Sequence, residues 1–154
     1  MNVMAEEDKS MADEVLMTER VRTATMLLVH ESGEKRAVIR RAVDRAGLNA
    51  RLVLEAANGY EALALIAAVK VDVALVSAEM KLMGSVELMA RISERTRRHT
   101  ECVLLVENEE AAKVAANYST GASAQLMMPL MPEELRRVTD GILRREKGNE
   151  RMRG

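Results

Sequence analysis

Residues 71–77 read Val-Asp-Val-Ala-Leu-Val-Ser, an apolar run that ends abruptly in a hydroxyl. A short run that is apolar on both faces indicates a central strand of a parallel sheet covered by helices on each side. In such a sheet, ligands and chemistry lie just beyond the carboxyl ends of the strands. The side chains around Ser77 are therefore expected to decide what the protein does.

Four further strands are expected, two before this run in the sequence and two after it. Their ranges are 25–29, 51–56, 101–106 and 124–128. Between and after the strands, apolar residues keep helical spacing. The helices are expected over 33–46, 58–69, 85–95, 108–118 and 132–145. Five strands alternating with five helices predict an α/β fold with a parallel sheet built by right-handed crossovers.

Helix ends are marked by residues suited to them. Ser32, Asn58 and Asn108 stand where a side-chain oxygen can cap a helix N-terminus. Gly47 suits the left-handed position after a helix, and Pro132 suits the first helical position. These signals support the helix boundaries.

The chain of 154 residues has room for one ordinary domain and short tails. Residues 1–22 are rich in Asp and Glu and predict a flexible acidic tail, with a short helix near 13–20. A partner-binding helix that folds on contact is the functional alternative for that segment. Residues 23–146 are expected to form the domain, and residues 147–154 a basic C-terminal tail.

Composition excludes several classes of protein. Hydrophobic residues make up 48% and charged residues 31%, with a net charge of -1, so no global field favours nucleic acid or membrane. Aromatic residues make up only 1%, which disfavours base stacking, and the single Cys102 excludes an intramolecular disulfide. No apolar run spans a bilayer, no signal peptide is recognised, and a cytoplasmic protein without a cofactor is expected.

The C-terminal end leaves one alternative open. A group of basic residues there could touch nucleic acid, although Glu146 and Glu150 interrupt it. A solvated helix end stabilised by the helix dipole is the preferred interpretation, so nucleic acid is not an expected partner. The basic residues are Arg144, Arg145, Lys147, Arg151 and Arg153.

Three stretches make the chain similar to a known family. They are Ala-Ala-Asn-Gly-Tyr-Glu-Ala-Leu (56–63), Gly-Ala-Ser-Ala (121–124) and Met-Pro-Leu-Met-Pro-Glu-Glu-Leu (128–135). With them, residues 25 to about 145 resemble the CheY-like receiver domain of bacterial response regulators. The resemblance implies a doubly wound, flavodoxin-like fold with five helices around a five-stranded parallel sheet of order 2-1-3-4-5.

The resemblance also implies a phosphorylation site, and this chain departs from it. The family uses an acidic pair for Mg²⁺, an acceptor Asp, a Thr or Ser, a Lys and a switch aromatic. The matching residues here are His30 with Glu31, Ser77, Val106, Met128 and Gln125. Only Glu31 keeps the expected chemical character.

The departures remove the chemistry in physical terms. His30 is a poor Mg²⁺ ligand, and a serine hydroxyl without an adjacent base is not an activated nucleophile. Val106 cannot donate a hydrogen bond to a phosphoryl oxygen, and Met128 cannot neutralise its charge. We therefore expect a stand-alone pseudo-receiver of a two-component or phosphorelay system, not an enzyme, that acts by phosphorylation-independent contact with other proteins.

Other interpretations of the same residues remain open. His30 and Ser77 should face each other, which raises a Ser-His hydrolase, although no tight nucleophile turn surrounds Ser77. A hydrogen bond between these two side chains is the structural interpretation. His30 with Glu31 and Glu79 could trap a divalent ion, and an atypical regulator still modulated by phosphorylation or by a bound ion is the alternative function. No metal site is predicted.

The loops around the expected site are unusually apolar. Methionine recurs on surfaces that adapt to partners, so these loops predict a docking surface for a kinase, a regulator, a scaffold or a second copy of the chain. Its residues are Met80, Leu82, Met83, Gln125, Leu130 and Met131. The resemblance further implies a cis peptide bond before Pro129.

Overall fold

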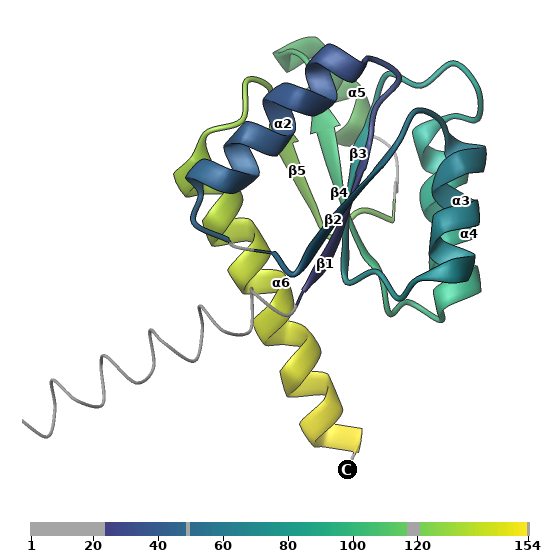
Figure 1. Ribbon diagram of the computed structural model, residues 1–154, viewed down its shortest axis with the longest axis vertical. Coiled ribbons are helices and arrows are strands. Elements are labelled where there is room, and N and C mark those ends of the chain that lie inside the picture. Colours follow the sequence, from purple (N-terminus) through teal and green to yellow (C-terminus); the bar gives the residue numbers. More distant parts are fainter. Residues whose placement is uncertain (1–23, 49, 117–120, 154) are drawn as a thin grey trace, which may run out of the picture.

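The computed structural model describes residues 24–48, 50–116 and 121–153. Within these ranges, helices cover both faces of one parallel sheet of five strands, in the order β2-β1-β3-β4-β5 (Figure 1). The strands are β1 (Thr25–Val29), β2 (Leu52–Ala56), β3 (Val73–Ser77), β4 (Glu101–Val106) and β5 (Ala124–Met127). The described helices are α2 (Gly33–Arg45), α3 (Gly59–Ala68), α4 (Ser85–Thr96), α5 (Glu109–Ala116) and α6 (Pro132–Arg153). The expected fold class and strand order are confirmed.

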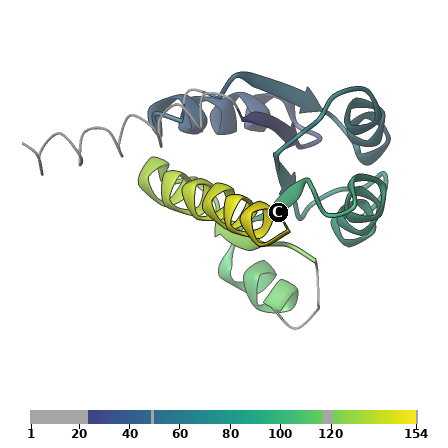
Figure 2. The same ribbon diagram turned by 90° about the horizontal axis from the view of Figure 1, so that it is seen from below.

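The helices form two layers, one on each face of the sheet (Figure 2). Helices α2 and α6 bury Ile39, Val43 and Leu135 against one face, a cluster that we call the α2/α6 core. Helices α3 and α4 bury Leu63 and Leu88 against the other face, where α5 packs from the side, and we call this cluster the α3/α4 core. Every residue of β1 and of β3 is buried, because both faces of these strands are covered.

The expected helix signals are confirmed where the structure describes them. Ser32 Oγ accepts the backbone N–H of Lys35, and Asn58 Oδ1 accepts that of Glu61. Asn108 Oδ1 likewise accepts the N–H of Ala111. Gly47 follows α2 with a left-handed φ of 69°, the conformation that glycine adopts without a Cβ penalty.

Two segments differ from expectation or fall outside the description. Helix α6 continues to Arg153, through residues expected to form a basic tail, and Figure 1 shows it extending past the amino end of the sheet. The acidic segment 1–22, its expected helix at 13–20, and the expected end of the fourth helix at Tyr118 lie outside the described residues. None of the helices in the described ranges is both long enough and apolar enough to cross a bilayer.

Candidate functional site

Three neighbouring strands deliver polar side chains to the carboxyl end of the sheet, the upper end in Figure 1. His30 follows β1, Ser77 ends β3 and Glu107 follows β4. Side chains alternate along a strand, and the residues two positions earlier all lie in the α2/α6 core. Together with Lys35 of α2, these three residues form what we call the carboxyl-end site.

His30 is buried at this site, with 5% of its surface exposed. Its Nδ1 accepts the backbone N–H of Ser32 at 3.0 Å, so a neutral ring carries its proton on Nε2. Nε2 lies 3.7 Å from Glu107 Oε1, which is too long for a hydrogen bond, and it has no hydrogen-bond partner. Burial lowers the pKa of His30, an effect that the nearby Glu107 carboxylate partly opposes.

The mouth of the site holds an ion pair. Lys35 Nζ lies 2.9 Å from Glu107 Oε1, joining the first turns of α2 to the residue after β4. The pKa of Glu107 is lowered because its carboxylate accepts a hydrogen bond from the Lys35 ammonium, and the same bond raises the pKa of Lys35. The Lys35 ammonium is therefore already engaged by Glu107.

Ser77 is almost fully buried, with 1% of its surface exposed. Its Oγ accepts the backbone N–H of Glu79 at 3.1 Å, which ties the hydroxyl to the loop after β3. The expected hydrogen bond between Ser77 and His30 is wrong, since no bond joins them and the two side chains bond to different backbone groups. The geometry therefore holds no serine–histidine pair of the kind that a hydrolase needs.

Glu31 bonds to the backbone of a loop and does not lie in a cluster with other acidic side chains of the described residues. Its carboxylate accepts the backbone N–H of Lys81, linking the end of β1 to the loop between β3 and α4. Across the described part of the chain, no group of three or more His, Cys, Asp or Glu side chains could hold a metal ion.

The assignment of Val106 to this site is wrong. Val106 is fully buried in the α3/α4 core, on the opposite side of the sheet from the carboxyl-end site. The next residue, Glu107, reaches the site instead. The alternation of side chains along a strand could have indicated Glu107 in place of Val106. Glu107 lies two residues beyond Leu105, just as Ser77 lies two residues beyond Leu75, so both point to the same face of the sheet.

Lys35 was also missed in the sequence. It lies one turn into the helix that follows β1, at the same end of the sheet as Ser77. Its position next to the strand end was the available signal, but no motif marks it.

Of the residues expected near β5, Met128 follows its last residue, whereas Gln125 lies near its start. Met128 is half-buried and packs against the α2/α6 core, and the Met128–Pro129 peptide bond is cis, as expected. Gln125 is exposed, with its Nε2 3.4 Å from the carbonyl oxygen of Ala112 in α5. A methionine thioether at position 128 brings no charge to the site.

The predicted docking surface is only partly exposed. Leu82 and Met131 are 59% and 61% exposed, and Met80 is half-buried against the α3/α4 core. Met83 and Leu130 are buried, at 8% each, so their assignment to the surface is wrong. Met83 holds a left-handed backbone with a φ of 79°, which turns its side chain inward against the start of α3.

The comparisons with known proteins agree with this architecture. The family model of the response regulator receiver domain matches residues 26–140. No curated protein matches the chain. Many solved structures do, and three of them are described next.

Chemotaxis protein CheY4 of Vibrio cholerae is 25% identical, with a TM-score of 0.66 over 78% of this chain and 98% of that one. The receiver domain of an HD domain-containing protein of Pseudomonas fluorescens Pf-5 is 21% identical, with a TM-score of 0.71 over 82% and 98%. The receiver domain of AraT, a response regulator of Geobacillus stearothermophilus, is 23% identical, with a TM-score of 0.70 over 83% and 98%. On the family match over residues 26–140 and on its sheet order, the chain belongs to the response regulator receiver domain family.

Proposed function

We propose that this receiver domain signals by contact with another protein and does not accept a phosphoryl group. The observation that carries the proposal is Ser77 at the end of β3, where the family resemblance calls for the acceptor Asp. The hydroxyl is buried and bonded to the loop backbone, and no base lies within hydrogen-bond distance of it among the described residues.

The groups around Ser77 further oppose phosphoryl transfer. Glu107 places a negative charge near the position where the family has a neutral hydroxyl, and a phosphoryl group carries the same sign. Lys35 is drawn to Glu107 at 2.9 Å, and Met128 stands where the family has lysine. The Lys35 ammonium is thus already paired with a carboxylate and is not available to stabilise a transferring phosphoryl group.

The test is treatment with acetyl phosphate and Mg²⁺, followed by intact mass measurement. The matched control is the variant His30→Asp/Ser77→Asp/Glu107→Thr/Met128→Lys, which restores the family's groups on the same fold. We expect one added phosphate on the control and none on the natural chain. A Mg²⁺-dependent phosphate on the natural chain that Ser77→Ala removes contradicts the proposal.

A smaller change sharpens the test. Ser77→Asp alone places a new carboxylate close to Glu107 and in front of Met128. Like charge raises the pKa of that carboxyl and weakens its hold on a metal, so beryllofluoride is expected to leave its spectrum unchanged. Beryllofluoride-induced shifts that spread from position 77 into α5 would show that the single replacement suffices.

The proposed contact surface is the apolar rim of the carboxyl end, which we define as Leu82 and Met131. Receiver domains work by contact with other signalling proteins, and these two large side chains are exposed on loops after β3 and β5. Methionine is flexible and polarisable and recurs on binding surfaces that adapt to partners. The partner class is a kinase, a regulator, a scaffold or a second copy.

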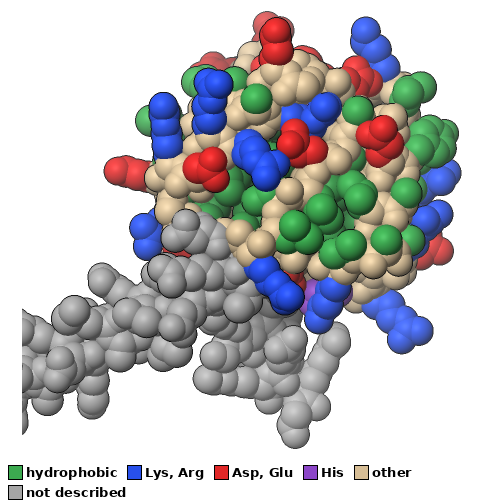
Figure 3. Space-filling view, viewed as in Figure 1, with side chains coloured by type: hydrophobic (Ala, Val, Ile, Leu, Met, Phe, Trp, Pro, Cys, Tyr) green, Lys and Arg blue, Asp and Glu red, His purple; other side chains and the backbone are tan. Residues whose placement is uncertain are grey.

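The surface charge gives no support to a nucleic acid partner on the face viewed in Figure 3. Lys and Arg side chains there are interspersed with Asp and Glu side chains. A mixed surface of this kind lacks the continuous positive potential that tracks a phosphate backbone.

The contact is tested with Leu82→Gln/Met131→Gln, against the control Val38→Gln/Tyr60→Gln, which removes exposed apolar groups from α2 and α3. In-cell cross-linking and mass spectrometry identify the partner, and sedimentation measures self-association. We expect the rim variant to lose the partner and the control to keep it, with unchanged unfolding midpoints. Equal recovery of the partner by both variants would overturn the assignment of the surface.

A further inference from the structure

A groove lies beside α4, away from the carboxyl-end site. It has a volume of about 640 Å³ and runs between α4 and Gly121, three residues before β5 begins. Met89, Ala90 and the exposed Val86 give it an apolar floor, since these side chains follow one another along α4. The apolar part of the groove therefore extends from Val86 to Ala90, roughly 6 Å along the axis of α4, and Ser93 continues the lining toward the arginines.

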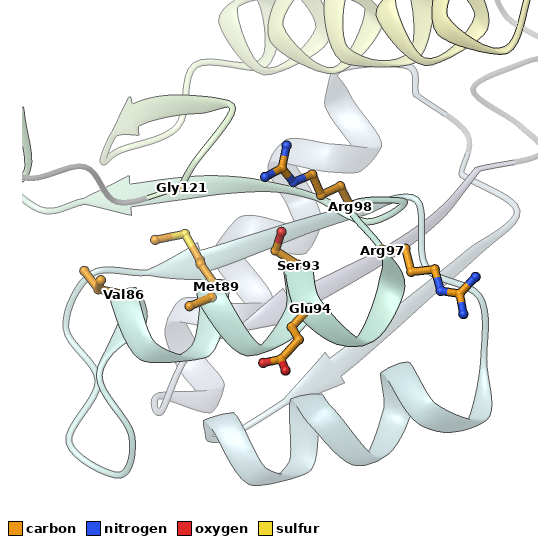
Figure 4. A pocket seen from close by; sticks show the side chains of 8 residues that line it. Val86, Met89, Ser93, Glu94, Arg97, Arg98 and Gly121 are labelled. Atoms are coloured by element: carbon orange, nitrogen blue, oxygen red, sulfur yellow. The ribbon is translucent and has the colours of Figure 1, made fainter. Parts of the chain in front are cut away.

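One end of this groove is positively charged. Arg97 and Arg98 line it at the C-terminal end of α4, and neither forms an ion pair with a carboxylate among the described residues. Both hold left-handed backbones, with φ of 51° and 64°, an uncommon conformation outside glycine. Figure 4 shows Arg98 reaching over the groove, whereas the Glu94 side chain points away from it and the Arg97 side chain points outward past the end of α4.

The described chain begins beside this basic end. The backbone N–H of Thr25 donates to Asp72 Oδ2 at 2.8 Å, and Asp72 Oδ1 lies 3.3 Å from the Nε2 of His99. His99 directly follows Arg98 in the sequence. Two contacts therefore connect the start of the first strand to His99, the residue that follows Arg98.

The chain before Ala24 has the composition that this groove fits. It carries six acidic residues against three basic ones, and it includes the apolar residues Met11, Val15 and Leu16. Glu19 precedes Ala24 by five residues, a span of at most about 17 Å when extended. We propose that the acidic segment 6–19 of this chain docks in the α4 groove, with its carboxylates on Arg97 and Arg98 and its apolar residues on Val86, Met89 and Ala90.

The proposal is tested on the full chain with a spin label. Cys102 is buried, and burial raises the pKa of its thiol to about 12, so a cysteine introduced by Ser10→Cys takes the label selectively. We expect the label to broaden the amide resonances of Ala90, Ser93 and Gly121, independently of protein concentration. Broadening that is absent, that lies elsewhere, or that grows with concentration and so reports a second copy, overturns the proposal.

Charge reversal supplies the matched comparison. Arg97→Glu/Arg98→Glu should lower the docked population roughly ten-fold, since two surface attractions become repulsions. Arg41→Glu/Arg137→Glu makes the same change in net charge on exposed residues of α2 and α6, and it should leave the broadening intact. Equal effects of the two variants would show that the segment responds only to net charge, against the proposal.

Two further variants guard against a local change in the end of α4. Ala90→Glu leaves both arginines in place and puts a negative charge in the groove, so it should also displace the segment. Glu14→Arg/Glu19→Arg should abolish docking by itself and regain it when combined with Arg97→Glu/Arg98→Glu. Failure of that combination to restore the broadening contradicts a direct pairing of these charges.

Discussion

The two ends of the sheet use a histidine and a carboxylate in different ways. At the amino end, Asp72 holds the Thr25 backbone N–H with one oxygen and faces the His99 ring at 3.3 Å with the other. At the carboxyl end, Glu107 Oε1 is bound to Lys35, and the His30 ring stays 3.7 Å away. Asp72 thus joins backbone segments 47 residues apart, whereas Glu107 joins only side chains.

This difference indicates which of the two carboxylates, Asp72 or Glu107, the fold depends on more. Further bonds at the amino end also reach the backbone, such as that from Thr100 Oγ1 to the carbonyl oxygen of Val71 at 2.6 Å. Removing such a side chain leaves a backbone group without its partner, which is costly in a part-buried place. The Lys35–Glu107 pair at the carboxyl end joins only side chains and can be exchanged without that cost. His30 and Ser77 at the same end each hold a backbone N–H, so they do not share this freedom.

The largest effect is expected from Asp72→Ala. The change leaves the Thr25 N–H without its acceptor and removes one interaction of His99, at a cost of about 2 kcal/mol in the free energy of unfolding. Urea denaturation measures the loss. Asp72→Asn keeps an oxygen for the Thr25 N–H and should recover most of it; an asparagine variant as unstable as the alanine variant would indicate that charge, not the backbone bond, matters.

A smaller effect is expected from Glu107→Ala. Lys35 is 44% exposed and returns to water when its partner is removed, so the loss of stability should stay below that of Asp72→Ala. The loss should shrink further in high salt, because salt screens a pair at the surface. Urea denaturation at low and high ionic strength provides the measurement, and a loss equal to that of Asp72→Ala would remove the contrast between the two ends.

The smallest effect is a change in the pH dependence of stability. Burial lowers the folded pKa of His30 below its ordinary value of 6.5, so its contribution is present above pH 6.5 and is lost as the pH falls from there toward the folded pKa. His30→Asn keeps an acceptor for the Ser32 N–H but does not titrate, so it should flatten the stability curve just below pH 6.5.

The lowered pKa of Glu107 supplies the control for that curve. Its contribution is present above the ordinary value of 4.5 and is lost as the pH falls further, so the steep fall in stability below pH 4.5 should remain in His30→Asn. A curve that keeps its slope between the folded pKa of His30 and pH 6.5 in this variant would assign that slope to another group.

The sequence was sufficient to predict the fold because its independent local patterns indicated the same helices and strands. Apolar strand runs, cap residues and helical spacing all placed the same boundaries, and β1 and β4 were predicted to the residue. The site was harder, because its chemistry depends on which face a side chain takes. Val106 and Glu107 are neighbours in sequence but lie on opposite sides of the sheet, and a shift of one position exchanges them.

The exposure of the apolar loop residues was predicted wrongly for a related reason. Met83 and Leu130 are buried although they lie in loops, because loop backbone conformation decides their direction and no periodicity reveals it. A left-handed methionine is not an arrangement that sequence propensity predicts. The exposed Leu82 and the buried Met83 are adjacent in sequence, so composition alone cannot separate them.

The hydrogen bond from the Ser32 N–H to His30 Nδ1 connects proton binding to the start of a helix. Ser32 is also the N-cap of α2, with its Oγ on the Lys35 N–H. A proton arriving at Nδ1 would face the Ser32 N–H donor, so the bond must break before the ring can be charged there. Acid should therefore lower the protection factors for amide hydrogen exchange at Ser32 and Lys35 before it affects those of the rest of α2, and the first turn of this helix would report the charge of a buried ring.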